Sequence, residues 1–152
     1  MKVRELMQTN VAWCGPRTDA ASIAEILWTK DCGSVPVVDE RNRILGIVTD
    51  RDLFIALGTR NHRASELKAD EVMRREVVTC GPEDDVKQAL AVMQTRRVRR
   101  IPVIDAERTV RGMLSIEDLV RHSARRPRDL PAADLMTALA QILDHGPNRV
   151  NA

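Results

Sequence analysis

A hydroxyl residue followed three positions later by an aspartate occurs twice in the sequence, each time at the end of a short apolar segment. The first pair is Thr49 and Asp52 in GIVTDRD, and the second is Ser115 and Asp118 in GMLSIED. If a helix begins at the hydroxyl residue, the unpaired N–H groups of its first turn favour an anion. The aspartate lies in that turn, where it can accept two hydrogen bonds from a cis-diol such as that of a ribose.

The same spacing has a structural interpretation. A Ser or Thr followed three residues later by an acid is the sequence of a capping box, which closes the start of a helix. For a single occurrence the cap is the commoner explanation. Two occurrences in register, each after Gly-hydrophobic-hydrophobic, favour a ligand site, and one junction can serve both purposes.

Both pairs belong to an internal repeat with a period of 66 residues. Val3–Leu53 aligns with Ala69–Leu119 without a gap, and 14 of the 51 positions are identical. Matched Gly, Pro and Asp residues hold turns and caps, so they indicate a matched backbone. The matches include Met7/Met73, Cys14/Cys80, Gly15/Gly81, Pro16/Pro82, Pro36/Pro102, Asp39/Asp105 and Gly46/Gly112.

Each copy shows the same order of predicted elements. The first has an extended segment 11–14, a helix capped by Thr18 or Asp19, strands 35–38 and 44–49, and a helix over 50–57. The second has an extended segment 77–80, a helix capped by Asp84, strands 101–104 and 110–115, and a helix over 116–122. A last helix is expected over 132–144, and residues 146–152 are expected to fray.

These elements predict an α/β fold (mixed α+β), with two tandem βαββα repeats about a pseudo-two-fold axis and a C-terminal helix. The expected boundaries are 1–60, 61–125 and 126–152. One copy is too small to bury its own faces, so the two should share a core. The proline in each middle strand predicts an edge strand or an interrupted one. The stripe Leu135, Leu139, Ile142 and Leu143 must pack on the module or on a partner.

Composition excludes several classes of protein. The net charge of +2 does not by itself indicate a nucleic-acid or membrane partner. The N-terminus lacks the apolar region of a secretory signal, and no apolar run approaches a membrane span. Three cysteines suit a reducing cytoplasm better than a disulfide framework. No hydrolase, metalloprotease or P-loop motif is present, so we expect no enzyme activity.

Two other features have rival interpretations. The basic run 96–100 could bind nucleic acid, but no aromatic residues flank it and it spans a helix end and a strand start, so a solvated surface or ligand phosphates are preferred. Cys14 and Cys80 could bind zinc with Cys32 or with His62, His122 or His145. No zinc-binding spacing occurs, so we expect buried inert cysteines and no metal.

The ordered motifs VPVVD and IPVID, then GIVTDRDL and GMLSIEDL, with LM and VM near the start of each copy, resemble the CBS-domain family. The resemblance covers about residues 3–120. It implies a tandem pair (a Bateman module) that binds an adenine nucleotide (AMP, ADP or ATP) or an adenosyl compound in the clefts between its copies. It also implies a homodimer through the helices of the repeats.

The resemblance also implies roles for individual residues. Thr49, Asp52, Ser115 and Asp118 would contact phosphate and ribose. Arg99 and Arg100 would reach phosphates, and Gly33 and Ser34 depart from that basic pattern in the first copy. The adenine would lie against the backbone of Cys32, Gly33 and Ser34 at one site and of Val98, Arg99 and Arg100 at the other. The Thr49/Asp52 site would then draw on the second copy and the Ser115/Asp118 site on the first, and the two should differ in affinity for charged ligands.

The sequence therefore predicts a cytoplasmic, non-catalytic sensor that reports ligand binding to an unknown regulated protein. A protein-interaction module with vestigial clefts is the main alternative, and a nucleic-acid-binding protein is the less favoured one.

Overall fold

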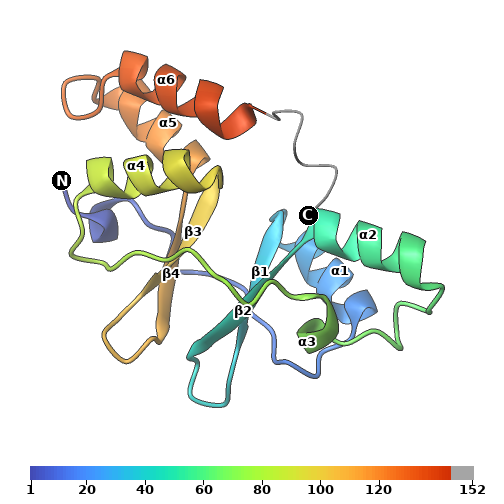
Figure 1. The fold of residues 1–152 in the computed structure, drawn as a ribbon. Helices are drawn as coiled ribbons and strands as arrows, with labels where there is room; N and C mark the ends of the chain where they lie inside the picture. The colour runs from blue at the N-terminus through green and yellow to red at the C-terminus, as the bar shows by residue number, and fades with distance from the viewer. Residues whose placement is uncertain (145–152) are drawn as a thin grey trace. The chain divides into compact units, whose positions relative to one another are not determined.

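The computed structural model describes residues 1–144, so the predicted fraying at 146–152 lies outside the described residues. The first copy contains η1 (Val3–Glu5), α1 (Ala20–Thr29), β1 (Ser34–Val38), β2 (Ile44–Thr49) and α2 (Asp50–Arg60). The second contains α3 (Ala69–Val72), α4 (Val86–Arg96), β3 (Arg100–Ile104), β4 (Val110–Ser115) and α5 (Ile116–Arg125), and α6 (Ala132–Leu143) follows (Figure 1). The predicted mixed α+β fold is confirmed.

The chain forms two compact units that do not coincide with the two copies. The first-copy unit comprises Asn10–Val77 and Ile104–Arg111. The second-copy unit comprises Met1–Thr9, Val78–Val103 and the described chain from Gly112 onward. Each unit thus contains the opening segment of the other copy: residues 1–9 belong with the second copy and residues 69–77 with the first.

The first-copy unit is built on a two-stranded antiparallel sheet. β1 pairs with β2, with Ser34 opposite Thr49, and all five residues of β1 are buried. Pro36 is tolerated because the sheet has two strands within residues 1–144, so that each is an edge strand, and the Pro36 carbonyl accepts a hydrogen bond from the Cys14 N–H at 3.0 Å. The core of this unit is formed by residues of both strands and of three helices. It includes Ile23, Val35, Val37, Val48, Leu53 and Ala69.

A carboxylate organises the turn between β1 and β2. Asp39 Oδ1 accepts the backbone N–H groups of Arg41 and Arg43, each at 2.9 Å. The Arg43 N–H, as the main contributor, lowers the pKa of Asp39 below its ordinary value. Asp105 plays the same part before β4, where Oδ1 accepts the Thr109 N–H at 2.8 Å. The repeated aspartate of VPVVD and IPVID is therefore a turn residue.

The second-copy unit repeats this plan. The structure differs from the sequence prediction in two local details. Asp85, not Asp84, caps α4 by accepting the Lys87 N–H at 2.8 Å. Asp84 instead accepts the Gly81 N–H at 2.7 Å and so stabilises the preceding turn. The predicted extended segments 11–14 and 77–80 form single bridges, Cys14 to Val37 and Cys80 to Val103, rather than strands.

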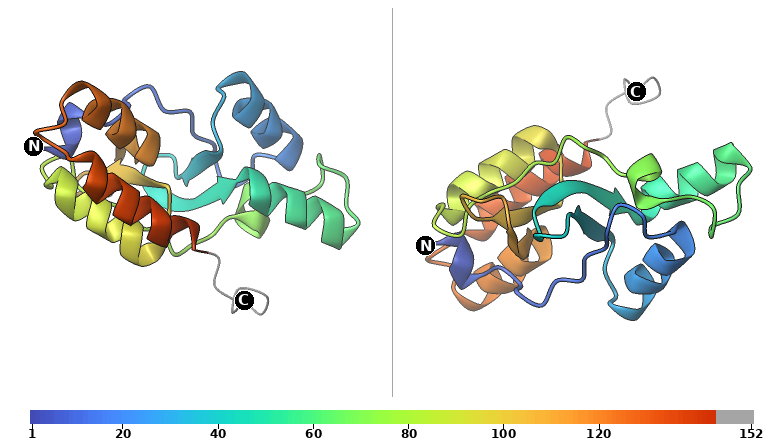
Figure 2. Two further views of the ribbon diagram at one scale, coloured as in Figure 1. Left: turned by 90° about the horizontal axis from the view of Figure 1, so that it is seen from above. Right: turned by 90° about the horizontal axis from the view of Figure 1, so that it is seen from below.

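The C-terminal helix packs on the second copy. α6 lies alongside α4 and also contacts α5 (Figures 1 and 2). Leu135, Ala138 and Ile142 of α6 are buried in the core of the second-copy unit. Leu143, which the sequence placed on the same stripe, is 51% exposed.

No helix in residues 1–144 is both long enough and apolar enough to cross a bilayer.

Candidate functional site

In both copies the predicted hydroxyl–aspartate pair lies where a strand meets a helix. β2 ends at Thr49 and α2 follows at once. Thr49 Oγ1 accepts the Asp52 N–H at 3.1 Å and donates to Asp52 Oδ2 at 2.7 Å. The same Oδ2 accepts the Thr49 N–H at 3.1 Å. The capping-box interpretation is therefore correct for this junction.

The second copy reproduces this geometry. Ser115 Oγ accepts the Asp118 N–H at 3.2 Å and donates to Asp118 Oδ2 at 2.6 Å. Oδ2 also accepts the Ser115 N–H at 3.0 Å. Asp118 is only 7% exposed. Each junction thus uses one carboxylate oxygen to close the helix and directs the other oxygen, Oδ1, elsewhere.

Both Oδ1 atoms are held by residues that the sequence analysis did not single out. Arg74 Nε donates to Asp52 Oδ1 at 3.0 Å, and its Nη2 lies 2.9 Å from the same oxygen. Gln8 Nε2 donates to Asp118 Oδ1 at 2.9 Å. Gln8 and Arg74 are equivalent, 66 residues apart, and each directly follows a repeated methionine. The repeat alignment pairs these two positions. It does not mark them as functional, because one holds Gln and the other Arg.

The glycine of each motif explains how these side chains reach their aspartates. A Cβ on Gly46 would lie 2.5 Å from Met73 Sδ and 2.9 Å from the Arg74 carbonyl oxygen. A Cβ on Gly112 would lie 2.7 Å from the Gln8 carbonyl oxygen. Glycine is required at both positions because the opening segment of the other copy crosses the strand there.

Two backbone hydrogen bonds fix each crossing. Ile47 and Arg74 exchange them at 3.0 and 2.9 Å, and Gln8 and Met113 do so at 2.9 Å each.

The first turns of the helices have fewer unpaired N–H groups than the sequence predicted. The Asp50 N–H donates to the Gly33 carbonyl at 3.3 Å, and the Ile116 N–H donates to the Arg99 carbonyl at 2.8 Å. The Arg51 N–H donates to the Asp50 carboxylate at 2.7 Å. The N–H groups of Asp50, Arg51 and Ile116 therefore already have acceptors and are not available to an anion. That part of the prediction is wrong.

The same contacts place the predicted adenine-binding segments. Cys32, Gly33 and Ser34 lie beside the Thr49–Asp52 junction in the first-copy unit, and Val98, Arg99 and Arg100 lie beside the Ser115–Asp118 junction in the second-copy unit. Each segment leaves its helix through a residue with positive φ, Asp31 at 47° and Arg97 at 52°. The Ser34 hydroxyl is buried and has no hydrogen-bond partner within residues 1–144.

The basic residues of the second copy differ in exposure and in whether they form an ion pair. Arg100 Nη2 lies 3.2 Å from Glu117 Oε1, and the Arg100 side chain is 26% exposed. Arg99 is exposed. Arg121 Nη1 lies 3.9 Å from Asp118 Oδ1, with its side chain 66% exposed. Arg99 and Arg121 are therefore exposed, whereas Arg100 is paired with Glu117.

The cysteines do not form a metal site within residues 1–144, and His145 lies outside that range. No group of three or more metal-ligating residues occurs there. Cys14 and Cys80 are buried, and burial raises the pKa of the Cys14 thiol to about 11 and that of Cys80 to about 12. Both thiols are therefore protonated at neutral pH, which disfavours metal binding and nucleophilic chemistry.

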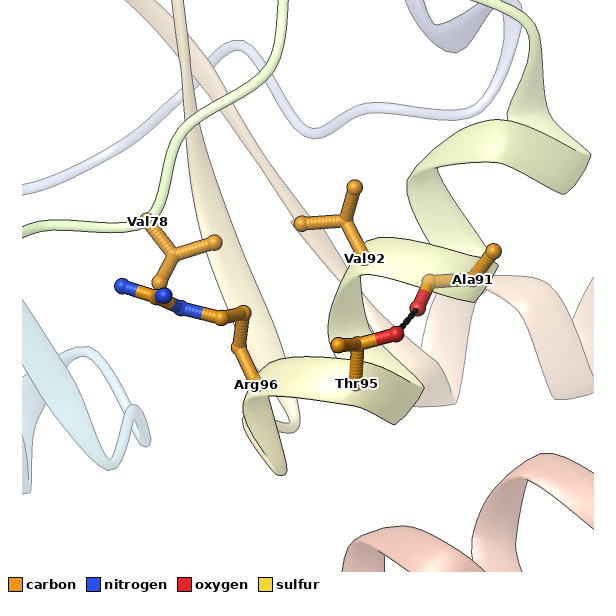
Figure 3. A pocket seen from close by; sticks show the side chains of 5 residues that line it. All are labelled: Val78, Ala91, Val92, Thr95 and Arg96. Atoms are coloured by element: carbon orange, nitrogen blue, oxygen red, sulfur yellow. Dashed lines mark hydrogen bonds between the residues drawn. The ribbon is translucent and has the colours of Figure 1, made fainter.

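Two surface hollows contain none of the predicted binding residues. One, on α4, has a volume of about 380 Å³ and is lined by Val78, Ala91, Val92, Thr95 and Arg96 (Figure 3). Thr95 does not offer its proton to a ligand there, because it donates to the Ala91 carbonyl at 2.9 Å. The other lies beside the turn held by Asp39 and includes Gly15, Pro16, Arg17 and Arg43.

Two tandem copies, each with a strand–helix junction that carries a capping aspartate, are the arrangement expected of a CBS-domain pair. The family model of the CBS domain matches residues 3–59 and 69–125, so the chain belongs to the CBS-domain family. A 33.4 kDa protein in the ribosomal RNA operon of Thermofilum pendens is 30% identical over 121 residues. That match covers 80% of this chain and 39% of the relative, so this chain spans well under two thirds of that relative's length.

Two solved structures share the fold. One is the CBS domain pair of protein MJ0100 in complex with 5-methylthioadenosine and S-adenosyl-L-methionine, with a TM-score of 0.75 and 24% identity, covering 83% of this chain and 98% of the other. The second is CBSX2 in complex with AMP, with a TM-score of 0.73 and 22% identity, covering 84% of this chain and 98% of the other.

Proposed function

We propose that this protein is a non-catalytic regulatory module that binds an adenine nucleotide or an adenosyl compound. The observation that carries the proposal is the twofold occurrence of a buried or half-buried aspartate whose Oδ2 is fixed by a cap while Oδ1 takes no part in the cap and accepts from Arg74 or Gln8. A carboxylate held in this way is preorganised to accept hydrogen bonds from a sugar diol. The adenosine-containing ligands of the MJ0100 and CBSX2 pairs agree with this chemistry.

In this proposal the residues divide into three groups by chemistry. The diol is held by Asp52 or Asp118, next to the hydroxyls of Thr49 and Ser115. The purine lies against the backbone of Cys32, Gly33 and Ser34 or against that of Val98 and Arg99. Phosphates are met by Arg99 and Arg100, because the first N–H groups of the helices are already bonded.

Ligand binding is proposed to act on a regulated protein by changing a conformational or association equilibrium. A ligand shifts such an equilibrium only to the extent that it binds one state better than the other. The alternative, an interaction module with vestigial clefts, would retain the capping boxes and lose the diol contact. Nucleic-acid binding is less favoured, because no aromatic side chains flank the basic run 96–100 and the run spans a helix end and a strand start.

A thermal-shift panel tests this function. Adenosine, AMP, ADP, ATP, NAD and S-adenosylmethionine would be compared with GMP as a purine control. A ligand present at 100 times its Kd should add about 2.7 kcal/mol to the free energy of unfolding. A rise in Tm with one or more adenosine compounds is expected. No rise with any of them would favour the interaction module.

We also propose a homodimer through the helices of the first copy. Trp28 on α1 is 86% exposed and Phe54 on α2 is 78% exposed, which are large apolar groups to leave in water. In the second copy the corresponding helices, α4 and α5, are packed against α6. A second chain is therefore expected to cover α1 and α2 rather than all four helices.

A further inference from the structure

We propose that Arg74 and Gln8 determine the relative affinity of the two sites, and that Arg74 makes the Asp52 site the weaker one for a sugar diol. This inference rests on the proposed function. It concerns Gln8 and Arg74, which lie outside the Gly-hydrophobic-x-Ser/Thr-x-x-Asp motif. Their side chains contact Oδ1, the carboxylate oxygen that takes no part in the cap.

Each of the two carboxylates accepts three hydrogen bonds from residues 1–144, and the two sites differ in the charge of the side chain that contacts Oδ1. An ionised carboxylate offers about four acceptor positions, two on each oxygen. At Asp52, Oδ2 accepts twice from Thr49, and two nitrogens of Arg74 face Oδ1 at 3.0 and 2.9 Å. The guanidinium of Arg74 therefore covers Oδ1 with one hydrogen bond and one further ion-pair contact, and a diol must compete with it for that oxygen.

At Asp118 a neutral amide takes the place of the guanidinium. Asp118 Oδ2 accepts twice from Ser115, but Oδ1 accepts only the Gln8 amide at 2.9 Å within residues 1–144. Arg121 lies 3.9 Å from that oxygen, which is too far for a hydrogen bond. A diol hydroxyl therefore competes at Asp118 with one neutral amide and not with a guanidinium.

The displaced group also differs in strength. The contact of Arg74 with Asp52 is charge-assisted, whereas that of Gln8 with Asp118 has a neutral donor. Because the Arg74 side chain is 63% exposed, solvent screening keeps the difference modest. Two backbone hydrogen bonds to Ile47 hold the Arg74 main chain, so the side chain can leave without moving the crossing segment.

The experiment exchanges the equivalent residues and measures adenosine binding by isothermal titration. Adenosine has no phosphate, so its Kd depends on the contacts of the sugar and the base and not on phosphate charge. Arg74→Gln is made in an Asp118→Ala background, which leaves the Asp52 site to be measured. Gln8→Arg is made in an Asp52→Ala background, which leaves the Asp118 site. Arg75→Gln is the matched control, because it removes the same charge from a side chain that donates to the Asp70 carbonyl at 3.2 Å instead.

Arg74→Gln should lower the Kd for adenosine at the Asp52 site about two- to fivefold, and Gln8→Arg should raise it at the Asp118 site by a similar factor. Arg75→Gln should change neither. The inference is overturned if Arg74→Gln leaves the Kd unchanged or raises it while Asp52→Ala still weakens binding. If neither aspartate substitution weakens adenosine binding, the proposed function itself fails, whatever the Arg74 variant does.

Discussion

In Asp52 and in Asp118 the two carboxylate oxygens make different contacts. Oδ2 closes the first turn of a helix, and Oδ1 is held by a side chain from the opening segment of the other copy. The spacing of Thr49 and Asp52 was sufficient to predict the cap. It could not predict Arg74 or Gln8, because their contacts depend on where a distant segment crosses the strand.

The cysteines give a prediction at the residue scale. Iodoacetamide at pH 8 should modify Cys32 in the native protein, whereas Cys14 and Cys80 should react only after denaturation. Cys14 and Cys80 are 4% and 7% exposed, and burial raises their pKa to about 11 and about 12, so little thiolate is present. Peptide mass mapping measures the extent of labelling at each cysteine.

Because the proposed purine contact includes Cys32, a saturating adenosine compound should slow its modification. Guanidinium-unfolded protein, in which all three cysteines should react, is the control. Rapid labelling of Cys14 in the native protein would contradict the packing described, and labelling of Cys32 at the same rate with and without ligand would contradict the proposed purine contact.

At the scale of elements, the crossing of each opening segment over a strand connects the fold to the site. Glycine at 46 and 112 permits the crossing, and the crossing delivers Arg74 and Gln8 to the carboxylates. A Gly46→Ala substitution should therefore destabilise the protein by about 1–3 kcal/mol, since the new methyl group would meet Met73 and the Arg74 carbonyl. Urea unfolding measures this as a lower midpoint.

Gly58→Ala is the control for that substitution. Gly58 lies within α2, and a Cβ there would have no atom within 4 Å. It should raise the free energy of unfolding by about 0.5–1 kcal/mol, because alanine is the better helix residue. A Gly46→Ala protein as stable as the unsubstituted one would show that the crossing is not tight.

The elements themselves were largely predictable from the sequence. Strands 44–49 and 110–115 have the predicted bounds, because each lies between a polar turn and the start of a helix. The cap of α4 was placed one residue early, since Asp84 and Asp85 are both good caps and only the turn at Gly81 decides between them. The unpaired N–H groups were overestimated because the carbonyls of Gly33 and Arg99 come from loops whose course the sequence does not specify.

At the scale of the whole molecule, the two copies differ most in what covers their helices. α6 packs on α4 and α5, while Trp28 and Phe54 remain exposed on α1 and α2. The protein should therefore sediment as a dimer, and the double substitution Trp28→Glu and Phe54→Glu should shift it toward the monomer without lowering its helix content. Sedimentation velocity with circular dichroism measures both properties.

Met136→Glu is the matched control, because Met136 on α6 is also exposed, at 65%, and lies outside the proposed interface. It should leave the sedimentation coefficient unchanged. A monomeric unsubstituted protein, or a double variant that stays dimeric, would contradict an interface through α1 and α2.

The central claim is that Asp52 and Asp118 bind the sugar of an adenosine ligand. Isothermal titration of whichever adenosine compound gives the largest thermal shift, against the unsubstituted protein, Asp52→Ala and Asp118→Ala, tests it most directly. Loss of a hydrogen bond to a charged group costs about 1.5–3 kcal/mol, so each substitution should weaken one site roughly 10- to 150-fold. Unchanged affinity at both sites in both folded variants would contradict the account.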